Sequence, residues 1–142
     1  MECVLRGKFK QLKIRPIVGD YIEYTIGEND LQGKIENILP RKNQLYRPKI
    51  ANVDQVILVT TVVNPPVDPI ILDKFLVQVE KENLECVIVI NKVDLVTEEE
   101  DKEYLDALIN IYEDMYTVIP VSTKTGENLD KLNIVFKDKI ST

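Results

Sequence analysis

The sequence predicts an α/β protein made of an incomplete, OB-fold-like antiparallel β module and part of a three-layer α/β domain with a parallel sheet. Two observations lead to this prediction. Residues 1–47 contain short segments in which apolar and polar residues alternate, whereas residues 48–142 contain longer apolar runs that alternate with amphipathic segments. We therefore expect two domains, with the change of pattern after Arg47.

The first part holds three strand candidates, each bounded by Gly, Pro, Asp or Asn. They cover residues 2–10, 20–26 and 32–39, and their alternation is typical of half-buried strands. An OB-fold needs five strands to close its barrel, so three candidates are too few. The module is expected to be incomplete at its N-terminus or to pack on another part of the protein.

The second part begins with a strand and a helix. Residues 54–63 (DQVILVTTVV) form a nearly continuous β-branched run, which is typical of a strand buried on both faces. Asp68 and Pro69 then provide an N-cap and a proline at the first helical position. The apolar residues that follow recur at helical spacing and predict one buried stripe, formed by Leu72, Phe75, Leu76 and Val79.

The alternation of strands and helices continues. Residues 85–95 (ECVIVINKVDL) and 116–122 predict two further strands. Residues 98–112 predict a helix, because acidic residues fill its first turn and an apolar face follows, made of Leu105, Leu108, Ile109 and Tyr112. A last helix is expected after Gly126, and its inward-facing residues are expected to be Leu129, Leu132 and Phe136. Such alternation implies a parallel sheet with right-handed crossovers and helices on both faces.

Composition excludes several kinds of chemistry. Of the 142 residues, 44% are hydrophobic and 30% are charged, as in soluble globular proteins, and no apolar run approaches the length of a membrane span. With no signal peptide visible, a cytoplasmic location is expected. The chain has no histidine, which removes every Ser-His or Cys-His arrangement, and Cys3 and Cys86 are expected to be free, buried thiols.

Charge is distributed unevenly along the chain. Residues 1–50 hold ten Lys/Arg against six Asp/Glu, whereas residues 51–142 hold eight against eighteen. Phosphate contacts need cations, and Tyr21, Tyr24 or Tyr46 could stack on a base. The same residues also fit a solvated surface around core tyrosines, and the residues alone favour that interpretation. The candidate RNA-binding residues are Arg6, Lys8, Lys10, Lys13, Arg15, Arg41 and Lys42.

Two polar clusters follow neighbouring strands of the predicted sheet. Asn91-Lys92-Val93-Asp94 comes directly after CVIVI, and Ser122-Thr123-Lys124 comes directly after VIPV. Ligands of parallel α/β sheets bind beyond the carboxyl ends of the strands, so both clusters are expected at the same edge. The pattern N-K-x-D is a weak signal by itself. Its position after a buried strand, with a second cluster after the next strand, favours a binding site over an ordinary surface turn.

The residue types in these clusters fit a guanine base. The pyrimidine edge of guanine presents two adjacent N–H donors, and O6 and N7 are acceptors. The Asp94 carboxylate can accept both donors, and it would repel adenine, which presents an acceptor at the corresponding position. Asn91 can contact N7 and also bind the backbone of its own loop. The aliphatic stems of Lys92 and Lys124 can cover the two faces of the base. The backbone N–H of Thr123 can donate to O6, and Ser122 can support Asp94.

N-K-V-D and S-T-K resemble the fourth and fifth motifs of Ras-type GTPases, which have a P-loop-type α/β fold. In those proteins the phosphate-binding loop comes first in the chain, whereas here the guanine motifs come first, which is the circularly permuted order. Within that group the chain closely resembles the family of ribosome small-subunit-dependent GTPase A, the RsgA/YjeQ type. The resemblance covers nearly the whole chain and includes V-G-D (18–20), R-P (47–48), I-A-N-V-D-Q-V (50–56), D-K-F-L-V (73–77), V-I-N-K-V-D-L (89–95), S-T-K-T-G (122–126) and K-D-K-I-S-T (137–142).

The resemblance implies that the ligand is GTP or GDP and that the protein is a GTP hydrolase of late small-subunit (30S) maturation, stimulated by that particle. It also implies that the β module contacts ribosomal RNA, which favours the RNA interpretation of the basic residues. Thr123 stands where the usual motif has Ala, and a contact through the backbone should tolerate this. Mg²⁺ and a structural Zn²⁺ are implied only for family parts that this sequence does not contain. A monomer with no membrane partner is expected.

No G-x-x-x-x-G-K-[ST] loop for phosphates occurs in the 142 residues. No catalytic residue and no metal ligand is therefore assigned, and the chain is expected to be a fragment that hydrolyses no GTP and binds guanine nucleotide weakly or not at all. A second class of function stays open, a non-enzymatic RNA-binding adaptor that has kept the guanine loops without catalysis. The codons after Thr142 distinguish the two, because only the enzyme needs a Gly-rich loop ending in Gly-Lys-Ser.

Overall fold

The computed structural model describes residues 2–11, 14–27 and 32–142. The chain folds as two compact units, Met1–Val53 and Asp54–Thr142. The change of unit lies slightly later than the change of sequence pattern after Arg47. The reason is a hairpin that ties residues 48–53 to the first unit, formed by the antiparallel strands β4 (Gln44–Tyr46) and β5 (Lys49–Ala51).

The first unit contains a sheet of three strands in the order β1-β3-β2. β2 (Ile22–Thr25) and β3 (Gly33–Ile38) pair antiparallel as predicted, whereas β1 (Cys3–Leu5) pairs parallel with β3. The strand predicted over residues 2–10 is wrong beyond Leu5, because Gly7–Gln11 form the helix α1. Phe9 is buried, with 5% of its surface exposed, and it belongs to this helix and not to a strand.

The loop before β2 approaches the backbone of β5 closely. Gly19 has a φ of +86°, and a Cβ atom at this position would lie 2.0 Å from the carbonyl oxygen of Ala51. Only glycine meets both conditions. Val18 and Ile50 form a parallel bridge beside it, and the buried Asn52 donates from Nδ2 to the carbonyl oxygen of Gly19 at 2.8 Å. The V-G-D and I-A-N segments of the sequence therefore meet in one structural feature.

Asp20 of the same loop forms an ion pair with Arg41, which lies between β3 and β4. Arg41 donates from Nε to Oδ1 of Asp20 at 2.6 Å and from Nη2 to Oδ2 at 2.8 Å, and the Asp20 side chain is only 2% exposed. Nη1 of Arg41 donates to Oε1 of Gln44 at 2.5 Å, and Oδ2 of Asp20 also accepts from the backbone N of Ile17 at 2.8 Å. The hydrogen bond from Arg41 holds the pKa of the Asp20 carboxyl below its usual value.

The second unit is built on a parallel sheet in the order β6-β7-β8. The register aligns Thr61 with Asn91 and Ile90 with Pro120, so the carboxyl ends of the strands meet at one edge. At the opposite end Gln55 forms a parallel bridge with Ser141. The strands are β6 (Gln55–Thr61), β7 (Glu85–Asn91) and β8 (Thr117–Pro120).

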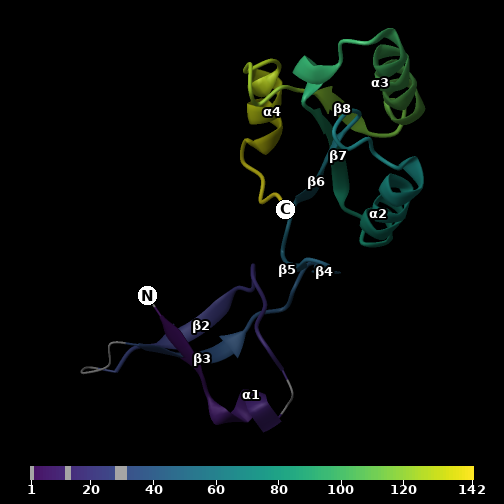
Figure 1. The fold of residues 1–142 in the computed structure, drawn as a ribbon. Coiled ribbons are helices and arrows are strands. Elements are labelled where there is room, and N and C mark those ends of the chain that lie inside the picture. Colours follow the sequence, from purple (N-terminus) through teal and green to yellow (C-terminus); the bar gives the residue numbers. More distant parts are fainter. Residues whose placement is uncertain (1, 12–13, 28–31) are drawn as a thin grey trace. The chain divides into compact units, whose positions relative to one another are not determined.

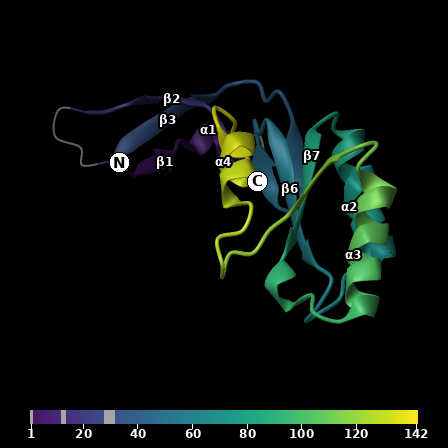
Figure 2. The ribbon, with the colours of Figure 1, turned by 90° about the horizontal axis from the view of Figure 1, so that it is seen from above.

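Helices cover both faces of this sheet (Figure 1). α2 and α3 lie on one side of β6 and β7, and α4 lies on the other (Figure 2). Asp68 caps the first of these helices as predicted, because its Oδ1 accepts from the backbone N of Ile70 at 2.9 Å. The predicted parallel, three-layer arrangement is confirmed. The helices are α2 (Pro69–Lys81), α3 (Glu99–Tyr112) and α4 (Leu129–Phe136).

The residues predicted to form the core differ in how far they are buried, and three of them are exposed. Four others are only half-buried, namely Leu105, Ile109, Leu129 and Leu132. The exposed fractions of Phe75 and Phe136 are 44% and 41%, which places both at the margin of their helical stripes. Val59 is 66% exposed because β6 is an edge strand of this sheet, so the prediction of burial on both faces is wrong there. The residues that do form the core of α2 and α3 are Leu72, Leu76, Val79, Leu108 and Tyr112.

Both cysteines carry free thiols. Cys86 is buried, and this burial raises the pKa of its thiol to about 11. Cys3 is half-buried, so the prediction of burial holds only for Cys86. In the described ranges, no helix combines the length and the apolar character needed to cross a membrane.

Candidate site at the strand ends

The first polar cluster lies where β7 ends. Asn91 is the last residue of that strand. Lys92 then adopts a left-handed backbone conformation with a φ of 66°, which turns the chain sharply. The short 3₁₀ helix η1 (Val93–Leu95) follows and contains Asp94. The backbone N of Val93 donates to the carbonyl oxygen of Val121 at 3.2 Å, so this turn is attached to the chain that leaves β8.

The second cluster forms a tight loop after β8. Ser122 is fully buried. Its backbone carbonyl oxygen accepts from N of Gly126 at 2.8 Å, and its own N donates to the carbonyl oxygen of Glu127 at 3.2 Å. Gly126 has a φ of +88°, a conformation that glycine adopts without strain. Backbone hydrogen bonds therefore fix the loop that carries Thr123 and Lys124 at the surface.

Asp94 connects the two clusters. Its Oδ1 accepts from the hydroxyl of Ser122 at 2.6 Å, and its Oδ2 lies 3.6 Å from Nζ of Lys124. The Asp94 side chain is 12% exposed, whereas that of Lys124 is 78% exposed. The Ser122 hydrogen bond is the main cause that lowers the pKa of the Asp94 carboxyl, the charge of Lys124 lowers it further, and desolvation opposes both. The carboxylate is thus held ionised and oriented.

Asn91 binds the same loop from the other strand. Its Oδ1 accepts from the backbone N of Lys92 at 2.8 Å and from the backbone N of Thr123 at 3.2 Å. Its Nδ2 has no hydrogen-bond partner among the residues that the structure describes, and it remains available as a donor. The sequence predicted that Asn91 ties its own loop to neighbouring backbone, and these contacts do so.

Lys92 reaches a third strand end. Its Nζ donates to the carbonyl oxygen of Asn64, in the loop after β6, at 2.5 Å. Asn64 also has a positive φ of 51°. Asn64 was not among the site residues predicted from the sequence. The signal was present in the Asn64-Pro65-Pro66 turn, but nothing in the sequence says that a lysine from the next strand reaches its carbonyl.

All six predicted guanine-site residues therefore come from two neighbouring strand ends and are linked by hydrogen bonds or an ion pair. The predicted RNA-binding residues are arranged differently. Arg6 forms an ion pair with Glu36, and Arg41 is engaged by Asp20. Lys42 donates from its backbone N to Oδ1 of Asn52 at 2.9 Å, and Arg15 is exposed. Lys13, like the side chains of Lys8 and Lys10, lies outside the described residues.

A Ser122→Ala variant tests how the carboxylate is held. Because the Ser122 hydroxyl is the main cause that lowers the pKa of Asp94, we expect that pKa to rise in the variant, as measured by a carbon-13 NMR titration of the carboxyl. The variant should also bind guanine nucleotide roughly 5- to 10-fold more weakly. Thr125→Ala is the matched control in the same loop, and an equal effect of both variants contradicts this role of Ser122.

Because the pKa of Asp94 is lower in the folded state, it also determines the direction in which stability depends on pH. The carboxylate contributes stability above its unfolded-state value of about 3.8, and this contribution is lost as the pH falls through the lower folded value. Ser122→Ala should therefore weaken the acid dependence of stability below about pH 4.

Among the described residues, no group of three or more Cys, Asp or Glu side chains could hold a metal ion.

The fold defines the class of protein, because it matches circularly permuted GTPase structures. The chain superimposes on the crystal structure of YjeQ from Thermotoga maritima with a TM-score of 0.86 at 48% identity, covering 98% of this chain and 49% of that one. It also matches YloQ, described as a circularly permuted GTPase, with a TM-score of 0.77 at 38% identity, covering 98% of this chain and 48% of that one.

The chain belongs to the RsgA GTPase family. The model of that family's GTPase domain matches residues 38–142, and the model of the RsgA N-terminal domain matches residues 1–35. Curated relatives named small ribosomal subunit biogenesis GTPase RsgA are 48% identical over 140 residues in Thermotoga neapolitana and 49% identical in Thermotoga maritima. Each match covers 99% of this chain and 47% of the relative, so the chain spans about half the length of these proteins.

Proposed function

We propose that the loops after β7 and β8 bind the base of a guanine nucleotide, and that the protein is a GTPase of small ribosomal subunit maturation. The observation that carries the proposal is the Asp94 carboxylate, which is ionised, 12% exposed and hydrogen-bonded to Ser122 between two strand ends. A fixed carboxylate at this edge can accept the two adjacent N–H donors of guanine.

The other residues of the two loops are placed to contact N7, O6 and the two faces of the base. The free Nδ2 of Asn91 is a donor for N7. The backbone N of Thr123 now donates to Asn91 at 3.2 Å, and it can turn toward O6 when the base enters. The aliphatic stem of Lys92, whose Nζ is bound to Asn64, is suited to cover one face of the base. Lys124 covers the other face once its ammonium leaves the carboxylate.

The proposed reaction is GTP hydrolysis in the cytoplasm, and the named curated relatives support it. GTP hydrolysis needs Mg²⁺, which neutralises charge on the β- and γ-phosphates. No described residues of this chain form a cluster for that ion or for the Zn²⁺ that the family resemblance implies. The residues of the chain bind and select the base.

The proposed macromolecular partner is the small ribosomal subunit, contacted through its RNA by the first unit. Three tyrosines of that unit are exposed, Tyr21 at 55%, Tyr24 at 47% and Tyr46 at 74%, so they are free to stack on bases. The alternative interpretation, a solvated surface around core tyrosines, required these three residues to be buried, and they are not. The basic residues proposed to contact phosphates are Arg6, Lys8, Lys10, Lys13, Arg15 and Lys42, without Arg41, whose guanidinium is paired with Asp20.

A GTPase assay with purified small ribosomal subunits tests the proposed function. The complete gene product is expected to hydrolyse GTP but not ATP, and to do so faster when subunits are added. The 142-residue chain alone is expected to show no turnover, because it contains no phosphate-binding loop. Equal use of ATP and GTP by the complete gene product contradicts the proposal, and turnover by the chain alone contradicts its predicted inactivity.

The same assay tests the RNA surface. Replacing Lys8, Lys10 and Lys13 together with Ala is expected to reduce the stimulation by subunits and to flatten its salt dependence. The control removes the same charge from the second unit, through the residues Lys74, Lys81 and Lys102, all on helices of that unit. An unchanged salt dependence in the first variant counts against RNA contact at these positions.

A further inference from the structure

A groove lies between α2 and α3 and shares no residue with the strand-end site. Its volume is about 400 Å³, which is within the range of ligand-binding pockets. One wall is a single face of α2, with residues at positions i, i+3, i+4 and i+7, namely Asp73, Leu76, Val77 and Glu80. The other wall is the end of α3 and the turn after it, formed by Tyr112, Met115 and Tyr116.

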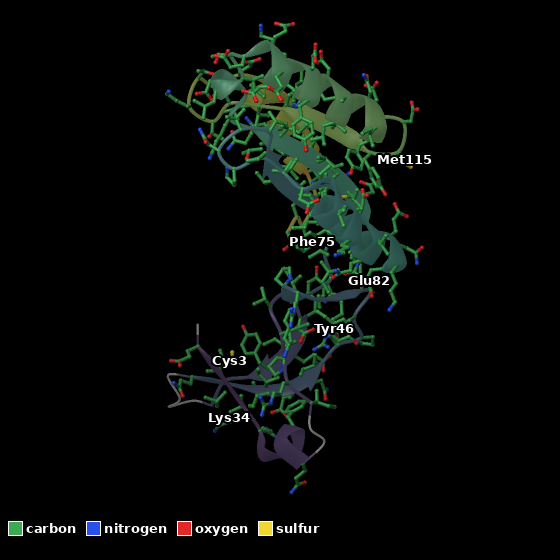
Figure 3. All side chains as sticks on the ribbon, turned by 45° about the vertical axis from the view of Figure 1, so that its right-hand side comes forward. Cys3, Lys34, Tyr46, Phe75, Glu82 and Met115 are labelled. Carbon is green, nitrogen blue, oxygen red and sulfur yellow. The ribbon has the colours of Figure 1, made fainter. Side chains whose placement is uncertain are left out.

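The middle of this α2–α3 groove is apolar. Leu76 and Tyr112 are buried there, with 4% and 3% of their surfaces exposed. Val77 and Met115 stand at the rim, and each is 68% exposed. Figure 3 shows Met115 beyond the end of α3, on the outside of the second unit. Apolar side chains exposed around a concave surface are typical of an interaction site.

The two ends of the groove are acidic. Asp73 and Glu80 are seven residues apart on α2, so their backbones are separated by about 10 Å. Asp73 accepts from the hydroxyl of Tyr112 at 2.6 Å. Neither carboxylate has an ion-pair partner among the described residues, and no lysine or arginine lines the groove. Burial raises the pKa of Tyr116, and the nearby Glu80 carboxylate raises it further.

The surroundings extend this acidic character and leave room for a longer ligand. Glu113 and Asp114 stand between Tyr112 and Met115, so two further acidic residues adjoin the groove. A second cavity of about 380 Å³ shares Glu80, Met115 and Tyr116 with the groove and continues to the ion pair of Glu85 with Lys139. Phosphate groups are repelled by an acidic surface, so nucleic acid is a poor ligand here. A cationic ligand with apolar groups between its charges is complementary to it.

We propose that the α2–α3 groove binds a basic amphipathic helix of a partner protein, with cationic side chains on Asp73 and Glu80 and an apolar side chain against Val77 and Met115. A helix fits because residues seven apart on it are also about 10 Å apart and lie on one face. Its apolar residues at intermediate positions then face the apolar middle of the groove. The inference does not depend on nucleotide binding.

The test is fluorescence anisotropy with the 142-residue chain and a labelled helix-forming peptide. The peptide carries Arg at positions i and i+7 and Leu at i+3 and i+4. Glu80→Lys is expected to weaken binding roughly 3- to 10-fold, and Val77→Ser about fivefold. Both positions are exposed, so circular dichroism should show unchanged folding. Glu103→Lys is the matched control, because it lies nine residues before Tyr112, on the opposite face of α3.

Several results overturn this inference. One is the absence of binding to the unchanged chain, and another is an equal effect of Glu103→Lys and Glu80→Lys. If Val77→Ser weakens binding of a single-stranded RNA oligonucleotide, the face is an RNA site. If sedimentation shows a dimer that Val77→Ser dissociates, the groove is an interface between two copies. Weakening of peptide binding by both groove variants, with the control unchanged, supports the proposal.

Discussion

Replacing Asp94 with Asn is expected to lower the affinity of the complete gene product for GTP at least about 100-fold and to raise its affinity for xanthosine triphosphate. The Asp94 carboxylate accepts from Ser122 on one oxygen and keeps lone pairs for guanine. An amide at this position can accept from only one of the two guanine donors, and its own NH₂ group opposes the other. Xanthine has a carbonyl where guanine has its amino group, and this carbonyl can accept from the amide.

Titration of both nucleotides into both proteins measures this exchange of preference. Asp106→Asn is the control, since Asp106 is exposed on α3 and the substitution removes the same charge. The amide oxygen that Asp94→Asn introduces can still accept from Ser122, so the loop is expected to keep its structure. If the Asp94→Asn protein still prefers GTP to xanthosine triphosphate, then Asp94 does not read the base and the proposed function loses its main support.

Replacing Arg41 with Ala is expected to lower the free energy of unfolding of the first unit by about 3 kcal/mol. Asp20 is 2% exposed and receives two hydrogen bonds from the guanidinium, at 2.6 and 2.8 Å. Among the described residues, the backbone hydrogen bond from Ile17 is the one side-chain contact that this buried carboxylate keeps without Arg41. Amide hydrogen exchange measures the effect separately in each unit, and protection should fall in residues of the first unit while the second serves as an internal reference.

Arg47→Ala is the matched control for this prediction, because Arg47 is exposed in the same unit. The pH dependence provides an independent test. Since the folded pKa of Asp20 is lowered by Arg41, the pair stabilises the unit above the unfolded value of about 3.8, and this stabilisation is lost as the pH falls through the lower folded value. In Arg41→Ala this acid dependence should shrink. Equal protection in Arg41→Ala and Arg47→Ala contradicts the role given to the ion pair.

The sequence predicted the second unit well because its signals are local. The β-branched runs of β6 and β7, the Asp68 cap and the apolar stripes each depend on neighbours within a few residues. The strand-end clusters were predictable for the same reason, since parallel topology fixes where Asn91 and Ser122 meet. The errors at Phe75 and Phe136 lie at stripe margins, where spacing alone does not decide burial.

The first unit was harder to predict because long-range contacts determine it. Residues 2–10 alternate like a strand, yet β1 ends at Leu5 and the helix α1 follows. The parallel pairing of β1 with β3 joins segments about thirty residues apart, which no local pattern indicates. Arg41 was chosen as a phosphate contact by its charge. Only the fold reveals that Asp20, far from it in sequence, already neutralises that charge.

The contact between Lys124 and Asp94 has a consequence for how the strand-end site receives its ligand. Nζ of Lys124 lies 3.6 Å from Oδ2 of Asp94, so the chain itself provides a counterion for this carboxylate. Under the proposed function, an incoming base would exchange places with this ammonium group, which belongs to a side chain that is 78% exposed. We therefore expect binding of the base to be coupled to release of the Lys124 ammonium group.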